Sequence, residues 1–237
     1  MKLALAFCLA ATPSVVPTTA ETGRDRPLNW VDAGLLLGGA AGYLGLHKGG
    51  SDWALIDWPV PPAGPQWQED TVPTTAVIGT GVLLTLAAGM EGGLVEAVAM
   101  AQAGLVTAAA TNVLKILVGR PRPDYVDRTT RSYDSPETQA EELDDARLSL
   151  PSGHSSAAFA FATQTGRWLH RAGCARGWSK TARLAGYALP LTMAGAVAWT
   201  RVSDNRHYPS DVFAGALVGS GIAYGLDRWQ NGAVACP

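Results

Sequence analysis

Six long stretches of mainly apolar residues, separated by polar or proline-rich segments, run through the chain. Each stretch has the length of a helix, and none shows the strict apolar–polar alternation of a half-buried strand. The pattern therefore predicts an all-α bundle of about six helices, with no internal repeat. The expected helices cover residues 31–46, 74–90, 94–118, 152–170, 184–200 and 212–229.

The segments between these stretches carry signals for turns and loops. The Glu-Gly-Gly sequence at 91–93 predicts a short turn, and Gly119, followed by two nearby prolines, predicts the end of the third helix. Ser152 is a suitable N-cap for the fourth helix. We expect the proline-rich segment 47–72 to be an irregular packed loop. We expect the acidic segment 124–150 to be a loop that either shapes a substrate entrance or is simply solvated.

The N-terminus has the features of a secretory signal peptide. Residues 1–20 combine a positively charged start, an apolar core too short to span a bilayer and small residues at the exit. Residues 21–237 then form a single domain. Cys174 and Cys236 remain after removal of the signal, and they could pair in an oxidising compartment.

Composition narrows the function classes. Of the 237 residues, 47% are hydrophobic and only 16% are charged, which is less than in an average soluble domain. The formal net charge of −2 gives no indication of nucleic-acid binding. The 27 glycines allow helices to pack closely, as they do in membrane bundles.

Three polar clusters lie at the ends of apolar helices and carry the candidate chemistry. They cover residues 115–123, 151–154 and 200–211. In an up-and-down bundle these helix ends fall on the same side, so connectivity alone brings the clusters together. Together they supply cations, helix-terminal N–H groups, two histidines and an aspartate, which are the groups that phosphoryl transfer needs.

The clusters resemble the three-part signature of the type 2 phosphatidic acid phosphatase superfamily, which includes the bacterial acid phosphatases and the vanadium haloperoxidases. The resemblance covers roughly residues 75–228 and implies the helical fold of that family, with the active site at one end of the bundle. Thr200 stands where the family usually has Ser and keeps the hydroxyl group. The matching residues are Lys115, Arg122 and Pro123 in the first motif, 151–154 in the second, and Arg201, His207 and Asp211 in the third.

The resemblance implies a role for each matching residue. His207 corresponds to a nucleophile that forms a phosphohistidine, and Asp211 to the residue that holds its ring. His154 corresponds to the general acid and base. Arg120 and Arg206 fall outside the pattern, and we interpret them as supporting or solvated. The expected phosphate-binding residues are Lys115, Arg122, Ser152, Gly153 and Arg201.

The resulting hypothesis is a metal-independent phosphatase for a phosphomonoester or pyrophosphate, carried by a lipid. No cofactor is expected, although vanadate could occupy the phosphate site. One alternative is a soluble acid phosphatase of broad specificity. Another is a vanadate-dependent haloperoxidase, which is disfavoured because the haloperoxidases of the family are generally longer chains. The sequence does not fix the oligomeric state.

The expected location is a bacterial cell envelope. The basic connection at 171–183 lies at the bundle end opposite the clusters, so the positive-inside rule puts the site on the periplasmic side of an inner membrane. This arrangement requires that 31–46 packs on the bundle without crossing. The alternatives are six spans with an uncleaved N-terminus, or an exported soluble periplasmic domain.

Overall fold

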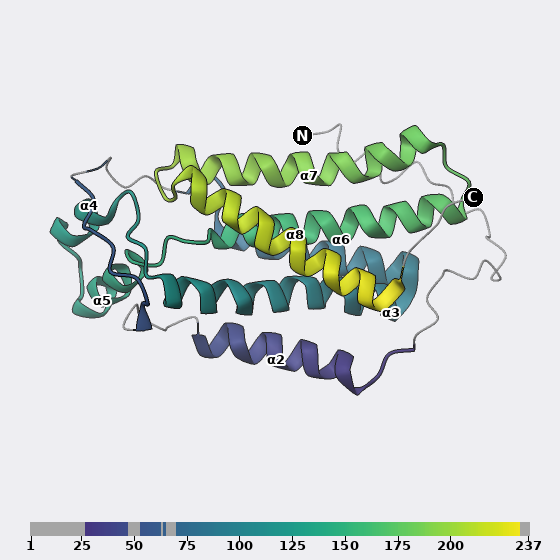
Figure 1. The fold of residues 1–237 in the computed structure, drawn as a ribbon, viewed down its shortest axis with the longest axis horizontal. Coiled ribbons are helices and arrows are strands. Elements are labelled where there is room, and N and C mark those ends of the chain that lie inside the picture. Colours follow the sequence, from purple (N-terminus) through teal and green to yellow (C-terminus); the bar gives the residue numbers. More distant parts are fainter. Residues whose placement is uncertain (1–26, 47–52, 63, 65–69, 233–237) are drawn as a thin grey trace.

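The computed structural model describes residues 27–46, 53–62, 64 and 70–232, so the signal-peptide prediction lies outside the described residues. Within them the chain is helical and contains no strand, which confirms the all-α prediction (Figure 1). The long helices lie roughly along one axis, and the two short helices α4 and α5 lie at one end. The helices are α2 (Trp30–Leu46), α3 (Thr74–Val118), α4 (Tyr125–Thr130), α5 (Pro136–Asp145), α6 (Gly153–Ala175), α7 (Lys180–Ser203) and α8 (Pro209–Asn231).

Helix α3 is a hairpin of two helical arms. It breaks at Gly93, whose φ of 77° and ψ of −178° favour glycine. A Cβ added to either Gly81 in the first arm or Gly104 in the second would collide with the ring of Phe161 in α6. Because one ring touches both arms, the arms lie side by side. The predicted pair of helices with a turn at 91–93 is therefore confirmed, and both ends of the hairpin lie at the same end of the bundle.

Helix α6 is central and packs against α3, α7 and α8, whereas α2 packs on α3. Two glycines in α8 allow the closest approach. A Cβ on Gly215 or Gly219 would collide with the backbone oxygen of Ser152 or Ser156, respectively. Contacts this close hold the first turns of α8 against the first turns of α6, where two of the three polar clusters meet.

The segment 124–150 is not the loop that the sequence predicted, because it contains α4 and α5. The two helices are held by ion pairs rather than by apolar packing. Arg128 of α4 is almost fully buried and contacts Glu142 of α5 at 2.7 Å and Asp145 at 2.8 Å. Long apolar stretches indicated the other helices, whereas these two short helices contain few apolar residues.

Helix α7 also begins earlier than predicted, at Lys180 rather than at residue 184. The Ser179 side chain caps it by accepting a hydrogen bond from the Ala182 amide at 3.2 Å. In the last turn of α6, Cys174 is disulfide-bonded. The pairing with Cys236 stays a prediction, because residues 233–237 lie outside the part of the chain that the structure describes.

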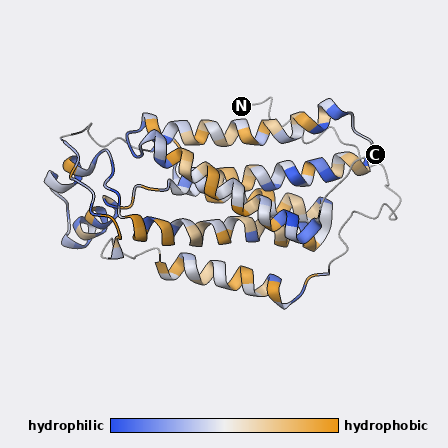
Figure 2. Cartoon of the chain, in the orientation of Figure 1, coloured by the Kyte–Doolittle hydropathy of each residue, from blue (hydrophilic) through white to orange (hydrophobic). Residues whose placement is uncertain are grey.

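The long helices carry many apolar residues, mixed with polar ones (Figure 2). Among the described residues, α3 is the one helix that contains a stretch long and apolar enough to cross a membrane, and only 11% of that stretch is buried. It is therefore not an ordinary core helix. Large apolar side chains are also exposed on α7 and α8, namely Leu184, Leu189, Met193, Trp199, Phe213 and Leu217.

Candidate active site

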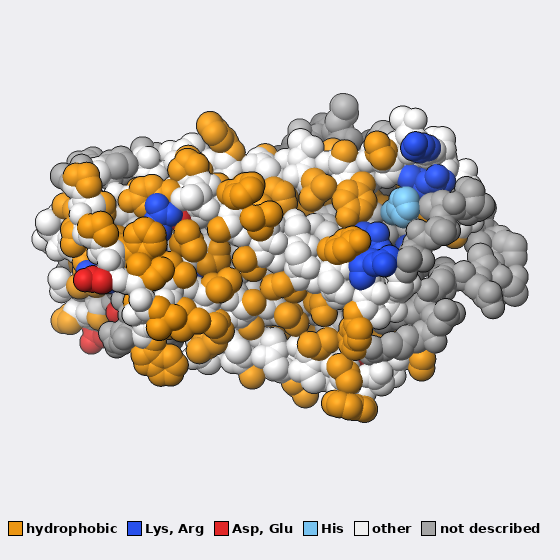
Figure 3. Space-filling view, in the orientation of Figure 1, with side chains coloured by type: hydrophobic (Ala, Val, Ile, Leu, Met, Phe, Trp, Pro, Cys, Tyr) orange, Lys and Arg blue, Asp and Glu red, His pale blue; other side chains and the backbone are white. Residues whose placement is uncertain are grey.

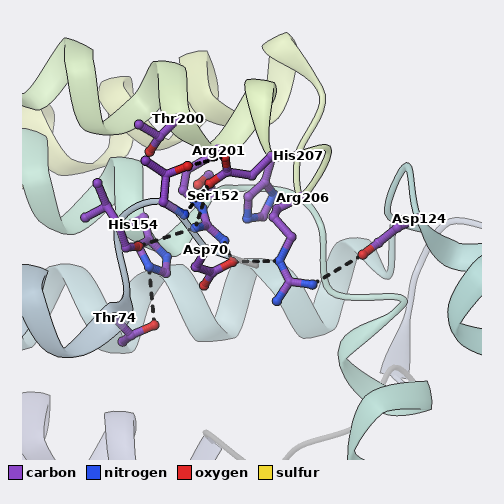
Figure 4. Close-up of polar contacts among 12 residues, drawn as sticks. Asp70, Thr74, Asp124, Ser152, His154, Thr200, Arg201, Arg206 and His207 are labelled. Atoms are coloured by element: carbon purple, nitrogen blue, oxygen red, sulfur yellow. Dashed lines mark hydrogen bonds and ion pairs between the residues drawn. The ribbon is translucent and has the colours of Figure 1, made fainter. Parts of the chain in front are cut away.

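The three polar clusters meet at the bundle end formed by the last turn of α3, the start of α6 and the junction of α7 with α8. Figure 4 shows residues of the second and third clusters there. Main-chain hydrogen bonds join the second cluster to the third, and the segment just before the second cluster to the first. The Ser152 amide donates to the Asp211 carbonyl at 3.0 Å, and the Ser149 amide donates to the Arg120 carbonyl at 3.0 Å. The structure thus brings the predicted residues together, as the connectivity argument expected. Their catalytic roles remain predictions.

The first cluster is positioned by the way α3 ends. Gly119 adopts a left-handed conformation with φ of 60°, and its amide donates to the Lys115 carbonyl at 2.9 Å. The indole N–H of Trp58 donates to the Val118 carbonyl at 3.0 Å and so satisfies another group at this helix end. The chain therefore turns sharply after Val118, which brings Arg122 back over the site.

His207 is buried and held in one protonation state by its neighbours. Nη1 of Arg122 lies 3.1 Å from its Nε2. A guanidinium only donates, so Nε2 accepts and Nδ1 carries the proton. Nδ1 faces Oγ of Ser149 at 3.5 Å and Oδ2 of Asp211 at 3.7 Å. Burial, followed by the positive charges of Arg122 and Lys115, lowers the pKa of His207 well below its usual value. The imidazole is therefore neutral, with a lone pair on Nε2, as a nucleophile requires.

Asp211 is fully buried and has a partner for each oxygen. Oδ2 accepts from the Ser149 hydroxyl at 2.6 Å and from the Tyr208 amide at 3.0 Å. Oδ1 accepts from Nη1 of Arg120 at 2.7 Å. The guanidinium of Arg120 also lies over the Tyr208 ring, 4.2 Å from its centroid. The sequence left two interpretations of Arg120, as a residue that supports the site or as a solvated one, and these contacts agree with the first. The sequence analysis missed Ser149, which lies outside every motif.

The second cluster forms the N-terminus of α6. Oγ of Ser152 accepts from the Ser155 amide at 3.4 Å, so it caps the helix as predicted. A Cβ on Gly153 would lie 3.8 Å from Nζ of Lys115, which shows that this lysine faces the helix start. Nε2 of His154 lies 3.3 Å from Oγ1 of Thr74. Thr74 is the first residue of α3, whereas Lys115 lies in its last turn. The ammonium and the His154 ring thus both flank the N-terminal turn of α6, which is suited to an anion.

The protein's own carboxylates contact the arginines of the site. Oδ1 of Asp70 lies 3.1 Å from Nη2 of Arg201 and 2.9 Å from Nε of Arg206, and Figure 4 shows it between the two side chains. Burial alone would raise the pKa of Asp70, but Arg201 and then Arg206 outweigh it, so the pKa is lowered. Similarly, Nη2 of Arg122 contacts Oδ1 of Asp145 at 2.7 Å.

Sequence reasoning did not single out these two carboxylates. The excess of acidic residues in 124–150 was a signal for Asp145, whereas Asp70 had none, because it lies in the proline-rich segment 47–72, which contains no motif. Arg206, interpreted as supporting or solvated, is a supporting residue through its contacts with Asp70 and Asp124. Within the described residues, no group of three or more His, Cys, Asp or Glu side chains is placed to hold a metal ion.

A cavity of about 590 Å³ joins the polar site to an apolar wall. Its polar end includes Lys115, His154 and His207. From there it continues between the two arms of α3 and α6. The apolar side chains that line this part are Val77, Ile78, Val82, Leu86, Leu105 and Phe161.

Comparison with known proteins agrees with this arrangement. Residues 94–234, which include all three polar clusters, match the model of the PAP2 superfamily. The chain belongs to this superfamily. It is 34% identical over 131 residues to lipid phosphate phosphatase 1 of Arabidopsis thaliana, a match that covers 50% of this chain and 39% of that protein.

A second relative of this PAP2 chain comes from a fungus. The chain is 32% identical over 132 residues to probable diacylglycerol pyrophosphate phosphatase 1 of Schizosaccharomyces pombe, with 49% of this chain and 47% of that protein covered. The chain therefore spans less than half the length of the relatives it matches here. No solved structure gives a significant match.

Proposed function

We propose that this protein is a membrane-bound phosphatase that removes phosphate from a lipid phosphomonoester or pyrophosphate through a phosphohistidine, without a metal ion. The observation that carries the proposal is the single cavity in which His207, His154 and Lys115 lie at one end and apolar side chains form the remaining wall. A lipid phosphate has the same division between a charged head and an apolar tail. The names of the two relatives, a lipid phosphate phosphatase and a probable diacylglycerol pyrophosphate phosphatase, also support this substrate class.

In the first step, the Nε2 lone pair of His207 attacks phosphorus, and a P–N bond forms as the bond to the leaving oxygen breaks. His154 enters this step protonated and gives its proton to the leaving oxygen. The lipid then departs as an alcohol, or as a monophosphate when the substrate is a pyrophosphate. Asp211, with Ser149, keeps the proton of His207 on Nδ1 throughout, because both face that nitrogen.

In the second step, water attacks the phosphorus of the phosphohistidine. His154 accepts a proton from this water, and the P–N bond breaks with its electron pair returning to Nε2 of His207. Inorganic phosphate is released, and both histidines regain their starting protonation states.

The charge on the phosphoryl group is neutralised by Lys115, Arg122 and Arg201. For this, Arg122 turns its Nη1 donor from Nε2 of His207 towards a phosphate oxygen, which also frees the lone pair for attack. The backbone N–H of Gly153, at the start of α6, supplies a further donor. This set of cations takes the part that a metal ion takes in other phosphatases.

The exposed apolar helix faces support a place in a membrane, with the long helices across the bilayer and α2 packed on α3. Arg176 lies in the connection between α6 and α7, and Lys180 and Arg183 lie in the first turn of α7, so the positive-inside rule places this end in the cytoplasm. The catalytic end then faces the periplasm of a bacterial envelope.

The test is a measurement of phosphate release by the purified full chain in detergent. The substrates are phosphatidate, diacylglycerol pyrophosphate and p-nitrophenyl phosphate, each with EDTA present. We expect hydrolysis of the lipids in EDTA, and a fall of at least about a thousandfold for His207→Ala. His170→Ala is the matched control, because His170 lies outside the catalytic cavity, and it should retain full activity. Brief reaction with ³²P-labelled substrate should leave a base-stable, acid-labile label on the wild type and on His170→Ala, but not on His207→Ala.

Three results would overturn parts of this proposal. Full activity of His207→Ala would remove the phosphohistidine mechanism, and loss of activity in EDTA would remove metal independence. A strong preference for p-nitrophenyl phosphate over the lipids would instead indicate a broad-specificity acid phosphatase. Halide oxidation that needs added vanadate, without phosphate release, would indicate a haloperoxidase.

A further inference from the structure

A second cavity, of about 480 Å³, lies between α6 and α7 and has a strongly basic lining. It lies away from the catalytic end, near the C-terminal turns of α6 and the first turns of α7. Figure 3 shows Lys, Arg and His side chains gathered at the corresponding end of one face, beside apolar surface. The lining residues are Arg167, His170, Lys180, Arg183, Leu184 and Tyr187.

The charges around this cavity do not balance. Asp227 accepts from Nε of Arg167 at 2.6 Å and also pairs with Arg171, which in turn contacts Glu96 at 2.8 Å. Lys180 and Arg183 have no carboxylate partner among the described residues. Four cationic side chains at or beside the cavity therefore face only two carboxylates among the described residues, which leaves an excess of positive charge. The cations are Arg167, Arg171, Lys180 and Arg183, and the carboxylates are Glu96 and Asp227.

Two of the lining cations are fixed by the fold rather than free on the surface. Arg167 is anchored through Nε to the buried Asp227 at 2.6 Å, and its guanidinium carbon lies 5.3 Å from the centroid of the Tyr224 ring. Nη1 of Arg183 donates to the Trp178 carbonyl at 2.8 Å, which holds its guanidinium at the cavity.

The cavity has an apolar edge that opens to the outside. Leu184 and Tyr187 line the cavity, and Leu184 is 63% exposed. A ligand with an anionic head and an apolar tail would therefore contact the cations with its head and the exposed leucine with the start of its tail.

We infer that this cavity binds the phosphate head group of an anionic membrane phospholipid, at the membrane face opposite the catalytic end. The inference rests on the membrane placement in the proposed function, but not on the chemistry of His207. Lys180 is the first residue of α7, so its ammonium and the free N–H groups of the helix start act on the same phosphate. The acyl chains leave the cavity past the exposed side chain of Leu184.

The test uses native mass spectrometry of the full chain in detergent, titrated with dioleoyl phosphatidylglycerol or dioleoyl phosphatidylcholine. The two probes have the same chains, and only the first has a net negative charge. Wild-type protein should bind phosphatidylglycerol more tightly. The Lys180→Gln/Arg183→Gln double variant should lose about tenfold in affinity for phosphatidylglycerol and little for phosphatidylcholine.

Arg176→Gln is the matched control. Arg176 belongs to the same basic connection but pairs with the exposed Glu91 and does not line the cavity. It should bind phosphatidylglycerol as the wild type does. Because the double variant loses the Arg183 contact with Trp178, Lys180→Glu serves as a second variant that keeps this contact, and it should also lose phosphatidylglycerol binding.

Unchanged phosphatidylglycerol binding by both cavity variants would overturn the inference. Equal losses in Arg176→Gln would overturn it as well, because they would indicate only a general effect of charge. Displacement of phosphatidylglycerol by millimolar inorganic phosphate would assign the cavity to a soluble anion instead. Phosphate release measured on the same preparations separates the two proposals, because the lining residues of this cavity are not part of the catalytic site.

Discussion

The orientation of His207 is set by hydrogen bonds on every side of the residue. Its amide donates to the Arg201 carbonyl at 3.1 Å, Arg122 donates to Nε2, and Ser149 faces Nδ1. Ser149 also donates to Asp211 at 2.6 Å, so this one hydroxyl links the carboxylate with the imidazole. Ser149 is thus a positioning residue that the three sequence motifs do not include.

Replacing Ser149 by Ala should lower kcat by about 10–100-fold with little change in KM. The substitution removes one buried donor to Asp211, and a lost hydrogen bond to a charged group costs about 1.5–3 kcal/mol. Steady-state kinetics with a lipid phosphate across a range of pH values tests this, because a looser His207 would also shift the acid limb of the profile. Ser149→Thr, which retains the hydroxyl, should recover part of the activity.

The control for this prediction is Ser210→Ala. Ser210 contacts the same Arg120 at 2.7 Å but is exposed, and its loss leaves the Arg120–Asp211 pair intact. A kcat for Ser149→Ala equal to that of the wild type would show that Asp211 holds His207 without help from the hydroxyl.

At the scale of elements, the α3 hairpin and α6 together form the apolar part of the cavity. The ring of Phe161 fills the space that side chains at Gly81 and Gly104 would occupy. Gly104 lies 11 positions before Lys115 in the same arm, which corresponds to about 16 Å along a helix. The distance between the cationic end and the Phe161 ring is therefore set by helix geometry, and it fits the length of an acyl chain.

The Gly104→Ala variant should reduce activity on long-chain lipid phosphates more than on water-soluble phosphoesters. Its new methyl group pushes the Phe161 ring into the cavity, so KM should rise several-fold for a long tail and remain near the wild-type value for p-nitrophenyl phosphate. The measurement is kcat/KM for a series of phosphatidates of increasing chain length.

Gly79→Ala is the matched control, because a Cβ at Gly79 of the same helix meets nothing within 4 Å. Its chain-length profile should follow the wild type. An equal loss for long and short substrates in Gly104→Ala would mean that the ring does not limit the tail.

The whole molecule is divided into three zones along its long axis. The catalytic end carries α4, α5 and the ion pairs of Arg122, Arg128 and Arg206. The middle exposes large apolar side chains, and the opposite end is basic (Figure 3). This order matches the head-group, hydrocarbon and head-group zones of a bilayer.

Sodium carbonate should therefore fail to release the expressed protein from membranes, whereas detergent should release it. The exposed apolar side chains would otherwise have to enter water, at about 25 cal/mol for each Å². Immunoblots of pellet and supernatant after a carbonate wash provide the measurement. Recovery in the supernatant would instead support an exported soluble domain.

Much of this organisation could be predicted from the sequence because its signals are local. Apolar runs located the long helices, and motif spacing located His154, His207 and Asp211. Asp70 and Ser149 could not be found in this way, because their partners come from distant parts of the chain. Arg201 follows Asp70 by 131 positions, and Asp211 follows Ser149 by 62. No local pattern encodes such pairs.

In the proposed mechanism, the contact of Asp70 with Arg201 would make each catalytic cycle an exchange of anions. A substrate phosphate would replace the carboxylate at the guanidinium, and the carboxylate would return when inorganic phosphate departs. The site would then stay close to electroneutral at each stage, which would offset the repulsion among its buried cations. Because Asp70 competes with phosphate for Arg201, it would also weaken the binding of the product and so reduce product inhibition.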